Sequence, residues 1–371
     1  MIGRPTEVES LLSRHRPAPV TVVGWQPVPP WAVARARLDS AERVIAKWTR
    51  PHRGADGMRT ASWRTRTELA VLRFLSDDLG LGLAPRALAA DLDAGLVVLE
   101  DLAPRTPLDG LLRADGAAAH AVRLAAFARA RGELNAATAG QAATYHARRA
   151  ALGPITPDED RIVHFAGNRE EGHRQAAALG APIVGRAERE LATVREELAE
   201  PGSFLALSSG DPETNNVLVH PSGDPDARLI DFEFAAYAHA LHDAVCLHVP
   251  GPGWLSVRDD GLAAEYRRAL ARGVPEAEDD RRYGFGLAAA CLSYALNRLE
   301  RFPRVDARPA SDDSRPQLVA ILEAAARTAD AHRTLPHLAG WARQAAGLLR
   351  RRWPDADLDL DAVPPYTPRR R

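Results

Sequence analysis

The chain has 371 residues, of which 46% are hydrophobic and 26% charged, and its formal net charge at pH 7 is -1. This length allows two lobes with separate cores, and the balanced charge gives no indication of a nucleic-acid or membrane partner. Two cysteines are too few for a disulfide framework, and we expect neither a leader peptide nor a membrane-spanning segment. We therefore expect a cytoplasmic globular protein.

The first hundred residues predict a small sheet with one helix. Leu69, Leu72 and Leu75 recur at helical spacing and predict a helix over 61–80, which ends at Gly80. The expected strands lie at 20–25, 31–38 and 43–48 and, on either side of a turn at 93–95, within 84–102.

Lys47 is the single lysine among 48 basic residues, and it lies in the third of these strands. Side chains alternate along a strand, so Val44, Ala46 and Trp48 would share one face and Lys47 would project from the other. A coding preference for arginine explains one leftover lysine by chance. The alternative is a site that needs a compact ammonium between phosphate oxygens, where the planar guanidinium of arginine does not fit.

Beyond residue 104 the composition becomes helical, with one β-rich interruption at 203–234. We expect helices within 117–152, broken near Gly140, and from 256 to 350. Residues 154–200 predict proline-bounded loops followed by a helix at 187–200. The end of the chain, 353–371, looks irregular.

Three polar residues in the β-rich interruption form a candidate site. Asp211 follows an apolar strand, Asn216 begins the next strand, and Asp231 lies near the end of the last one. A hairpin would bring Asn216 and Asp231 together beside Asp211. Carboxylate and amide oxygens suit Mg²⁺, and a second carboxylate could orient a hydroxyl and accept its proton. Taken singly, each residue is explained as a turn, cap or surface residue.

Several segments together resemble the aminoglycoside phosphotransferase and choline kinase family. They are "SGDPETNN", "LIDFEFAAYAHALHD", "ARGELNAAT" and "TELAVLRFLSDDLGLGLAPRALAADLDAGLVVLEDL". The resemblance implies an α+β, bilobal protein-kinase-like fold. A small N-terminal antiparallel-sheet lobe with one helix would span residues 1–102 and bind the nucleotide, and a larger, mainly helical C-terminal lobe would span 103–371.

The same resemblance implies roles in the larger lobe. Asp211 would be the catalytic base or would orient the acceptor hydroxyl. Asn216 and Asp231 would hold Mg²⁺, and Asp243 would brace the catalytic loop.

In the smaller lobe, the resemblance implies that Lys47 contacts the α- and β-phosphates of ATP (or GTP) while paired with Glu68. The backbone at Glu100 and Leu102 would face the adenine edge. The implied activity is transfer of the γ-phosphoryl group to a hydroxyl of a small molecule that is aminoglycoside-, choline- or sugar-like.

Two departures from the family pattern motivate an alternative. Ser209 stands where the family has histidine, and the loop at 23–33 has one glycine and three prolines instead of a glycine-rich phosphate loop. The alternative is a kinase-like protein that binds a nucleotide or metabolite without transferring phosphate.

The partner is expected to be a small-molecule hydroxyl substrate, and the sequence leaves its identity and the oligomeric state open. An acidic pocket would suit a cationic acceptor, and the candidates for it are Glu213, Glu233, Asp259, Asp260 and Glu265. The same residues are also explained as surface charges.

Overall fold

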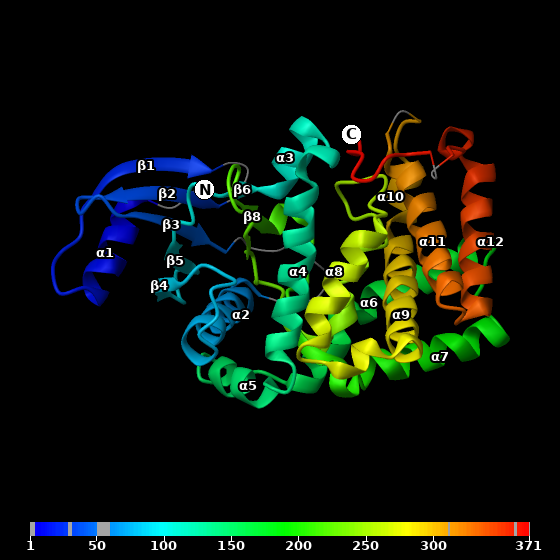
Figure 1. Ribbon diagram of the computed structural model, residues 1–371, viewed down its shortest axis with the longest axis horizontal. Helices are drawn as coiled ribbons and strands as arrows, with labels where there is room; N and C mark the ends of the chain where they lie inside the picture. Colours follow the sequence, from blue (N-terminus) through cyan, green and yellow to red (C-terminus); the bar gives the residue numbers. More distant parts are fainter. Residues whose placement is uncertain (1–3, 29–31, 50–59, 311, 360–361, 371) are drawn as a thin grey trace.

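The computed structural model describes residues 4–28, 32–49, 60–310, 312–359 and 362–370 (Figure 1). The β-sheet occupies one end of the molecule and the helices fill the rest, so the expected bilobal α+β architecture is confirmed. The division at residues 102 and 103 stays a prediction.

The smaller lobe holds a five-stranded antiparallel sheet in the order β1-β2-β3-β5-β4. Its strands are β1 (Val22–Val28), β2 (Val33–Leu38), β3 (Arg43–Trp48), β4 (Ala87–Asp91) and β5 (Leu96–Glu100). All five predicted strands are present. Val44 and Ala46 are fully buried on one face of β3, which confirms the predicted alternation along that strand.

Helix α1 (Pro5–His15) covers this apolar face and was not predicted. Its Val8, Leu11 and Leu12 are buried against the sheet at the spacing of one helical stripe. Pro5 in the first turn was the available signal, because proline is favoured at the first helical position.

Helix α2 (Ala61–Arg73) connects β3 to β4, and a π-helical turn, Phe74–Asp78, continues it. Gly80 follows in the left-handed region, with φ of 62°, where glycine has no steric penalty. The predicted helix and its end are confirmed.

The larger part is built mainly from helices. They are α3 (Leu108–Asp115), α4 (Ala121–Thr138), α5 (Ala142–Ala150), α6 (Pro157–Ala178), α7 (Arg186–Ala199), α8 (Asp260–Ala271), α9 (Asp280–Arg298), α10 (Phe302–Asp306), α11 (Ser314–Ala331) and α12 (Pro336–Arg352). The predicted break near Gly140 separates α4 from α5. None of the described helices is long and apolar enough to cross a membrane.

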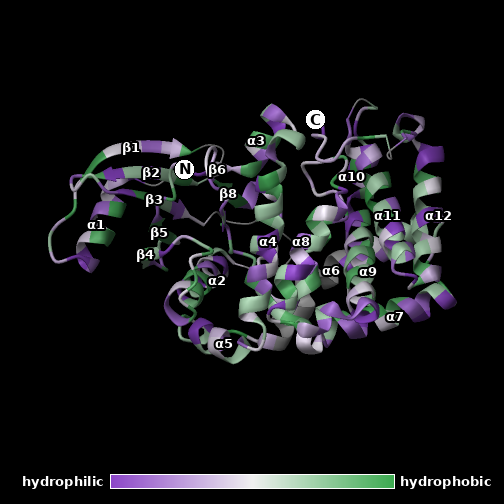
Figure 2. Cartoon of the chain, in the orientation of Figure 1, coloured by the Kyte–Doolittle hydropathy of each residue, from purple (hydrophilic) through white to green (hydrophobic). Residues whose placement is uncertain are grey.

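The prediction of loops for most of 154–186 was wrong, because α6 fills much of that segment. Glycine disfavours the interior of a helix, and Gly172 lies in the interior of α6. A Cβ atom there would lie 1.9 Å from the backbone oxygen of Leu296, so glycine permits the close approach of α6 to α9. Figure 2 shows that α7 is largely hydrophilic. In α9, by contrast, residues 287–292 are all buried.

Four short strands form the β-rich interruption: β7 (Leu205–Ser208), β8 (Val217–Val219), β9 (Ala227–Leu229) and β10 (Ala236–His239). β8 and β9 make the predicted hairpin, with Val217 opposite Leu229, and β6 (Thr106–Pro107) extends it. β10 lies beyond the predicted limit and pairs with β7. This pairing brings the segment after Asp231 back beside the strand that precedes Asp211.

The C-terminal segment is largely irregular, as expected, but it packs onto the helical part. Tyr366 is 2% exposed, and its ring lies 5.5 Å from that of Trp254. Backbone hydrogen bonds join Tyr366 to Ser256 and Arg369 to Gly253.

A glycine in α4 provides a test of the helix packing. A Cβ atom at Gly132 would lie 2.4 Å from the backbone oxygen of Tyr266 and 2.7 Å from the Cβ of Ala269, both on α8. Gly132→Ala is expected to lower the free energy of unfolding by about 1–3 kcal/mol, because α4 and α8 must separate. Urea unfolding measures this.

Gly340→Ala in α12 is the matched control. No atom lies within 4 Å of a Cβ built there, so alanine is expected to raise stability by about 0.5–1 kcal/mol through its helix propensity. Equal effects of the two substitutions would contradict the packing described here.

Candidate functional site

Lys47 joins three separate parts of the chain. It projects from β3 on the face opposite Val44 and Ala46, and its Nζ lies 2.7 Å from Glu68 Oε1 on α2 and 2.6 Å from Asp231 Oδ1. The side chains of Lys47, Glu68 and Asp231 are 15%, 2% and 37% exposed. The structure therefore brings together the predicted Lys47–Glu68 pair and adds Asp231 to it.

The charges of this group depend on one another. Burial alone lowers the pKa of Lys47, but the Asp231 and Glu68 carboxylates outweigh it and raise that pKa above its usual value, so the ammonium keeps its charge. Burial raises the pKa of Glu68, and the Lys47 ammonium opposes this shift.

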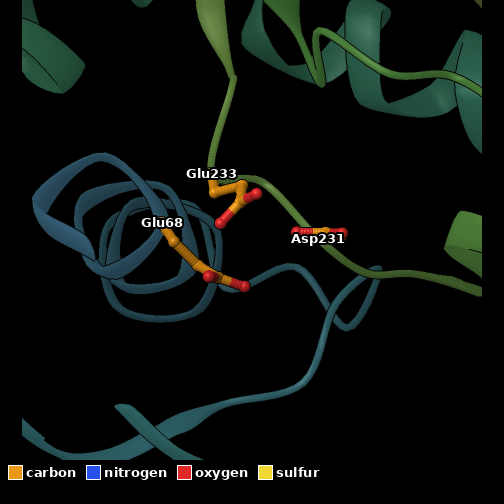
Figure 3. A group of neighbouring side chains, drawn as sticks. All are labelled: Glu68, Asp231 and Glu233. Atoms are coloured by element: carbon orange, nitrogen blue, oxygen red, sulfur yellow. The ribbon is translucent and has the colours of Figure 1, made fainter. Parts of the chain in front are cut away.

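Glu233 completes a cluster of three carboxylates with Glu68 and Asp231. One oxygen from each lies within 4.8 Å of the others, and Figure 3 shows Glu68 projecting from α2 toward the two acidic residues on the segment after β9. Arg64 Nη1 lies 3.1 Å from Glu233 Oε1. The formal charge of the three carboxylates exceeds that of Lys47 and Arg64 together by one negative charge. Carboxylate oxygens are the ligands that Mg²⁺ prefers.

The sequence analysis gave the metal to Asn216 and Asp231 and considered Glu233 only for an acidic pocket. The structure also groups Asp231 with Glu68 and Glu233, and the assignment of the metal to Asn216 and Asp231 stays a prediction. A sequence feature could have predicted that Glu233 lies beside Asp231. The two residues are two positions apart after a strand, which places both at one end of the hairpin.

Asp231 itself has φ of 66°, in the left-handed region that non-glycine residues rarely adopt. Such a conformation costs about 1–3 kcal/mol and persists only where its surroundings hold it. Its contact with Lys47 is one such restraint.

Asp211 and Asn216 lie together in the loop after β7. Asn216 Nδ2 donates to the backbone oxygen of Asp211 at 2.9 Å and to its Oδ2 at 3.0 Å. The N–H of Ile230 donates to the backbone oxygen of Asn216 at 3.0 Å, which places Asp231 next to this pair. The predicted juxtaposition of the three residues is present.

Buried polar groups support the loop from below. Asp243 Oδ1 accepts from Ser208 Oγ at 2.5 Å, and its Oδ2 accepts from the Ser209 N–H at 3.5 Å. Arg131 Nη1 donates to Ser209 Oγ at 2.6 Å, and Asn135 Nδ2 donates to the backbone oxygen of Leu207 at 2.9 Å. Arg131 is fully buried on α4 and was missed, because its partner lies 78 residues away in the sequence.

A cavity of about 80 Å³ opens beside Asp211, and we call it the acceptor cavity. Glu213, Asn297 and Arg298 also line it. The carboxylate of Glu213 lies against Gly251, where a Cβ atom would come within 2.0 Å of Oε1. Burial, and next the charge of Asp211, raise the pKa of Glu213 to about 7. Burial also raises the pKa of Asp211, followed by the charge of Asp231.

The other predicted acidic-pocket residues lie elsewhere. Asp259 caps the N-terminus of α8, Asp260 is exposed in its first turn, and Glu265 pairs with Arg268 at 2.5 Å. Only Glu213 of the five lines the acceptor cavity.

The two residues predicted to face the adenine edge lie at the end of β5 and just after it. Glu100 ends that strand, and its Oε2 accepts from the Arg86 N–H at 3.2 Å. The backbone oxygen of Leu102 accepts from the Arg105 N–H at 3.1 Å. Within the described part of the chain, the N–H of Leu102 has no acceptor.

No protein-family model matches the chain, and no curated protein matches its sequence. Solved structures are similar to it. One is the choline kinase LicA from Streptococcus pneumoniae, with 14% identity, coverage of 82% of this chain and 94% of that one, and a TM-score of 0.45. Another is a putative fructosamine-3-kinase from Thermobifida fusca, with 19% identity, coverage of 88% and 99%, and a TM-score of 0.48.

A third is the macrolide 2'-phosphotransferase MphH from Brachybacterium faecium, with 18% identity, coverage of 92% and 97%, and a TM-score of 0.44. The similar solved structures thus come from the aminoglycoside phosphotransferase and choline kinase family that the motifs resemble.

The raised pKa of Glu213 predicts a pH dependence of stability. Between pH 4.5 and 7 the folded state keeps a proton that the unfolded state releases, so this carboxyl group makes the free energy of unfolding fall as pH rises through that window. Glu213→Gln is expected to flatten this fall. Urea unfolding at several pH values measures it, with Glu196→Gln on the exposed face of α7 as the control. An unchanged pH profile in Glu213→Gln would contradict the assignment.

Proposed function

We propose that the protein is an ATP-dependent phosphotransferase that moves the γ-phosphoryl group to a hydroxyl of a small molecule. The observation that carries this proposal is the contact of Lys47 with both Glu68 and Asp231 beside the loop of Asp211 and Asn216. This contact supports the proposal, because phosphoryl transfer needs a cation, acidic groups for a metal ion and a separate carboxylate close together.

Lys47 supplies the charge that balances phosphate oxygens. Glu68 is almost fully buried on α2 and holds the ammonium in place, so that little reorganisation is needed when a nucleotide binds. Leu102 supports the nucleotide assignment, because its N–H is available to a base edge.

The acidic cluster fits a divalent cation. Asp231 would hold Mg²⁺, with Asn216 from the adjoining loop and Glu233 beside it, and the excess negative charge of the cluster favours this. When bound, Mg²⁺ supplies neutralisation of the β- and γ-phosphate oxygens.

Asp211 orients the acceptor hydroxyl and accepts its proton. The bond between the γ-phosphorus and the bridging oxygen breaks, a bond from phosphorus to the acceptor oxygen forms, and ADP leaves. Burial raises the pKa of Asp211, which makes its carboxylate a stronger base. The contact with Asn216 fixes the position of this carboxylate.

The alternative function is binding of a nucleotide or metabolite without transfer. The first observation behind it is Ser209 in place of the family histidine. Ser209 is buried and accepts a hydrogen bond from Arg131, so the loop is supported without that histidine. The second observation is the proline-containing loop at 23–33, of which 29–31 lie outside the described residues.

Asp211→Ala is expected to lower turnover by about 10²–10⁴-fold, since the group that accepts the proton is gone. Product formation from ATP across a panel of hydroxylated small molecules measures turnover. Stabilisation by ATP with Mg²⁺ should persist, because Asp211 does not hold the nucleotide.

The control is Asp224→Ala, which removes an exposed aspartate from the turn of the β8–β9 hairpin and should leave turnover unchanged. Near-normal turnover in Asp211→Ala would refute its role. Stabilisation of the wild-type protein by ATP without any product would favour the binding-only alternative.

Lys47→Arg keeps the charge but not the shape, because a planar guanidinium cannot reproduce the two contacts of the compact ammonium. Turnover is expected to fall by about 10²–10³-fold. Arg43→Lys on the same strand is the reciprocal control, and it should retain activity because Arg43 is half exposed and lies away from the cluster. Equal activity of the two variants would show that position 47 does not require lysine and that coding preference alone explains it.

A further inference from the structure

A second cavity, of about 190 Å³, adjoins the acceptor cavity, and we call it the arginine cavity. Both cavities are lined by Tyr294 and Arg298, so they meet at the end of α9. Among the described residues, five arginines and no carboxylate line the arginine cavity: Arg298, Arg301, Arg304, Arg308 and Arg369.

Acidic residues that do not line the cavity pair with some of these arginines. Glu300 is shared by Arg301, at 3.4 Å, and Arg304, at 2.7 Å. Arg308 pairs with Asp312 at 2.7 Å. Glu300 and Asp312 thus pair with three of the five arginines.

Arg298 lies at the junction of the two cavities. Its guanidinium lies 4.6 Å from the centre of the Tyr294 ring, and the Glu213 and Asp211 carboxylates act on it from the side of the acceptor cavity. Burial, and next the positive charge of Arg298, lower the pKa of Arg301. Two guanidinium groups that repel each other at a cavity wall are stabilised by an anion between them.

The cavity is held in shape by the C-terminal segment. Arg369 Nη1 donates to Gln317 Oε1 at 2.9 Å and to Ser314 Oγ at 3.2 Å. The backbone bonds from Tyr366 to Ser256 and from Arg369 to Gly253 anchor this segment. These restraints hold the Arg369 guanidinium at the cavity wall, and a group held in position binds an anion at a lower entropic cost.

The acceptor cavity has an unused polar group next to this junction. Asn297 is 7% exposed, and its Oδ1 is buried with no hydrogen-bond partner in the described part of the chain. It lines the same cavity as Asp211. A buried carbonyl oxygen of this kind is satisfied by a donor such as a ligand hydroxyl.

Resting on the proposed function, we propose that the phosphate acceptor is itself an anionic small molecule. Its oxyanion, a phosphate ester or a carboxylate, occupies the arginine cavity, and its hydroxyl reaches Asp211 through the acceptor cavity. A cationic acceptor would find the carboxylates of Asp211 and Glu213 in the acceptor cavity, but beyond them it would meet the five arginines of the arginine cavity.

The first test is calorimetric titration of inorganic phosphate into the full chain, without nucleotide. We expect saturable binding, weakened about tenfold or more in Arg301→Gln, since a charged hydrogen-bond donor is lost. Arg281→Gln, at the exposed start of the preceding helix α9, is the matched control and should bind phosphate normally. Arg304→Gln provides a second variant if Arg301→Gln fails to fold.

Absence of saturable binding, or equal affinity in Arg301→Gln and wild type, would overturn the proposal. Phosphate could instead bind the nucleotide site, and Lys47→Arg distinguishes the two locations. Loss of phosphate binding in Lys47→Arg but not in Arg301→Gln would also overturn the proposal.

The second test identifies the oxyanion. Hydroxylated phosphate esters, hydroxy acids and amino alcohols are each incubated with ATP and Mg²⁺, and mass spectrometry detects a product heavier by one phosphoryl group. Products from either anionic class support the proposal, and the class that reacts identifies the oxyanion. Products from amino alcohols alone would overturn it while leaving the phosphotransferase function intact. No product from any class would overturn that function, and the phosphate titration would then decide the anion site by itself.

Discussion

The ammonium group of Lys47 is the interaction on which the site depends. It is held between a carboxylate on α2 and a carboxylate after β9, so that the sheet, the helix and the β-hairpin meet at one atom. Removing buried charges from water is costly, and the cost is offset only when every partner is in place. The negative charge of Glu68, which is almost fully buried, is therefore stabilised by Lys47, and the positive charge of Lys47 is stabilised by Glu68. This pairing of buried charges favours a single arrangement of the sheet against the hairpin.

The helices serve the same site from the other side. Gly132 lets α8 approach α4 closely, and this approach brings the hydroxyl of Tyr266 within 2.7 Å of Asn135 Oδ1. Asn135 in turn holds the backbone of Leu207 at the end of β7, a few residues before Asp211. Gly132, which permits the close packing of α4 and α8, is thus connected through two buried hydrogen bonds to the position of the proposed catalytic carboxylate.

Charge changes sign along the proposed path of the substrates. Lys47 lies beside the acidic cluster, Asp211 and Glu213 follow at the acceptor cavity, and the arginine cavity lies beyond Arg298. The near-neutral total charge of the chain conceals this separation, because the opposing groups cancel in the sum. A substrate experiences the local field and not the total, so selectivity follows from this arrangement.

The sequence by itself determined the features that depend on neighbouring residues. Alternation along β3 placed Lys47 opposite Val44 and Ala46, and the turn after β8 paired Asn216 with the strand before Asp231, since strand and hairpin periodicity are local properties. Only the tertiary structure decided the rest. The helical character of α6, the role of Arg131 and the gathering of arginines from α9, α10 and the C-terminus arise from contacts between residues far apart in the chain. No local pattern encodes such contacts, because they exist only once the helices pack.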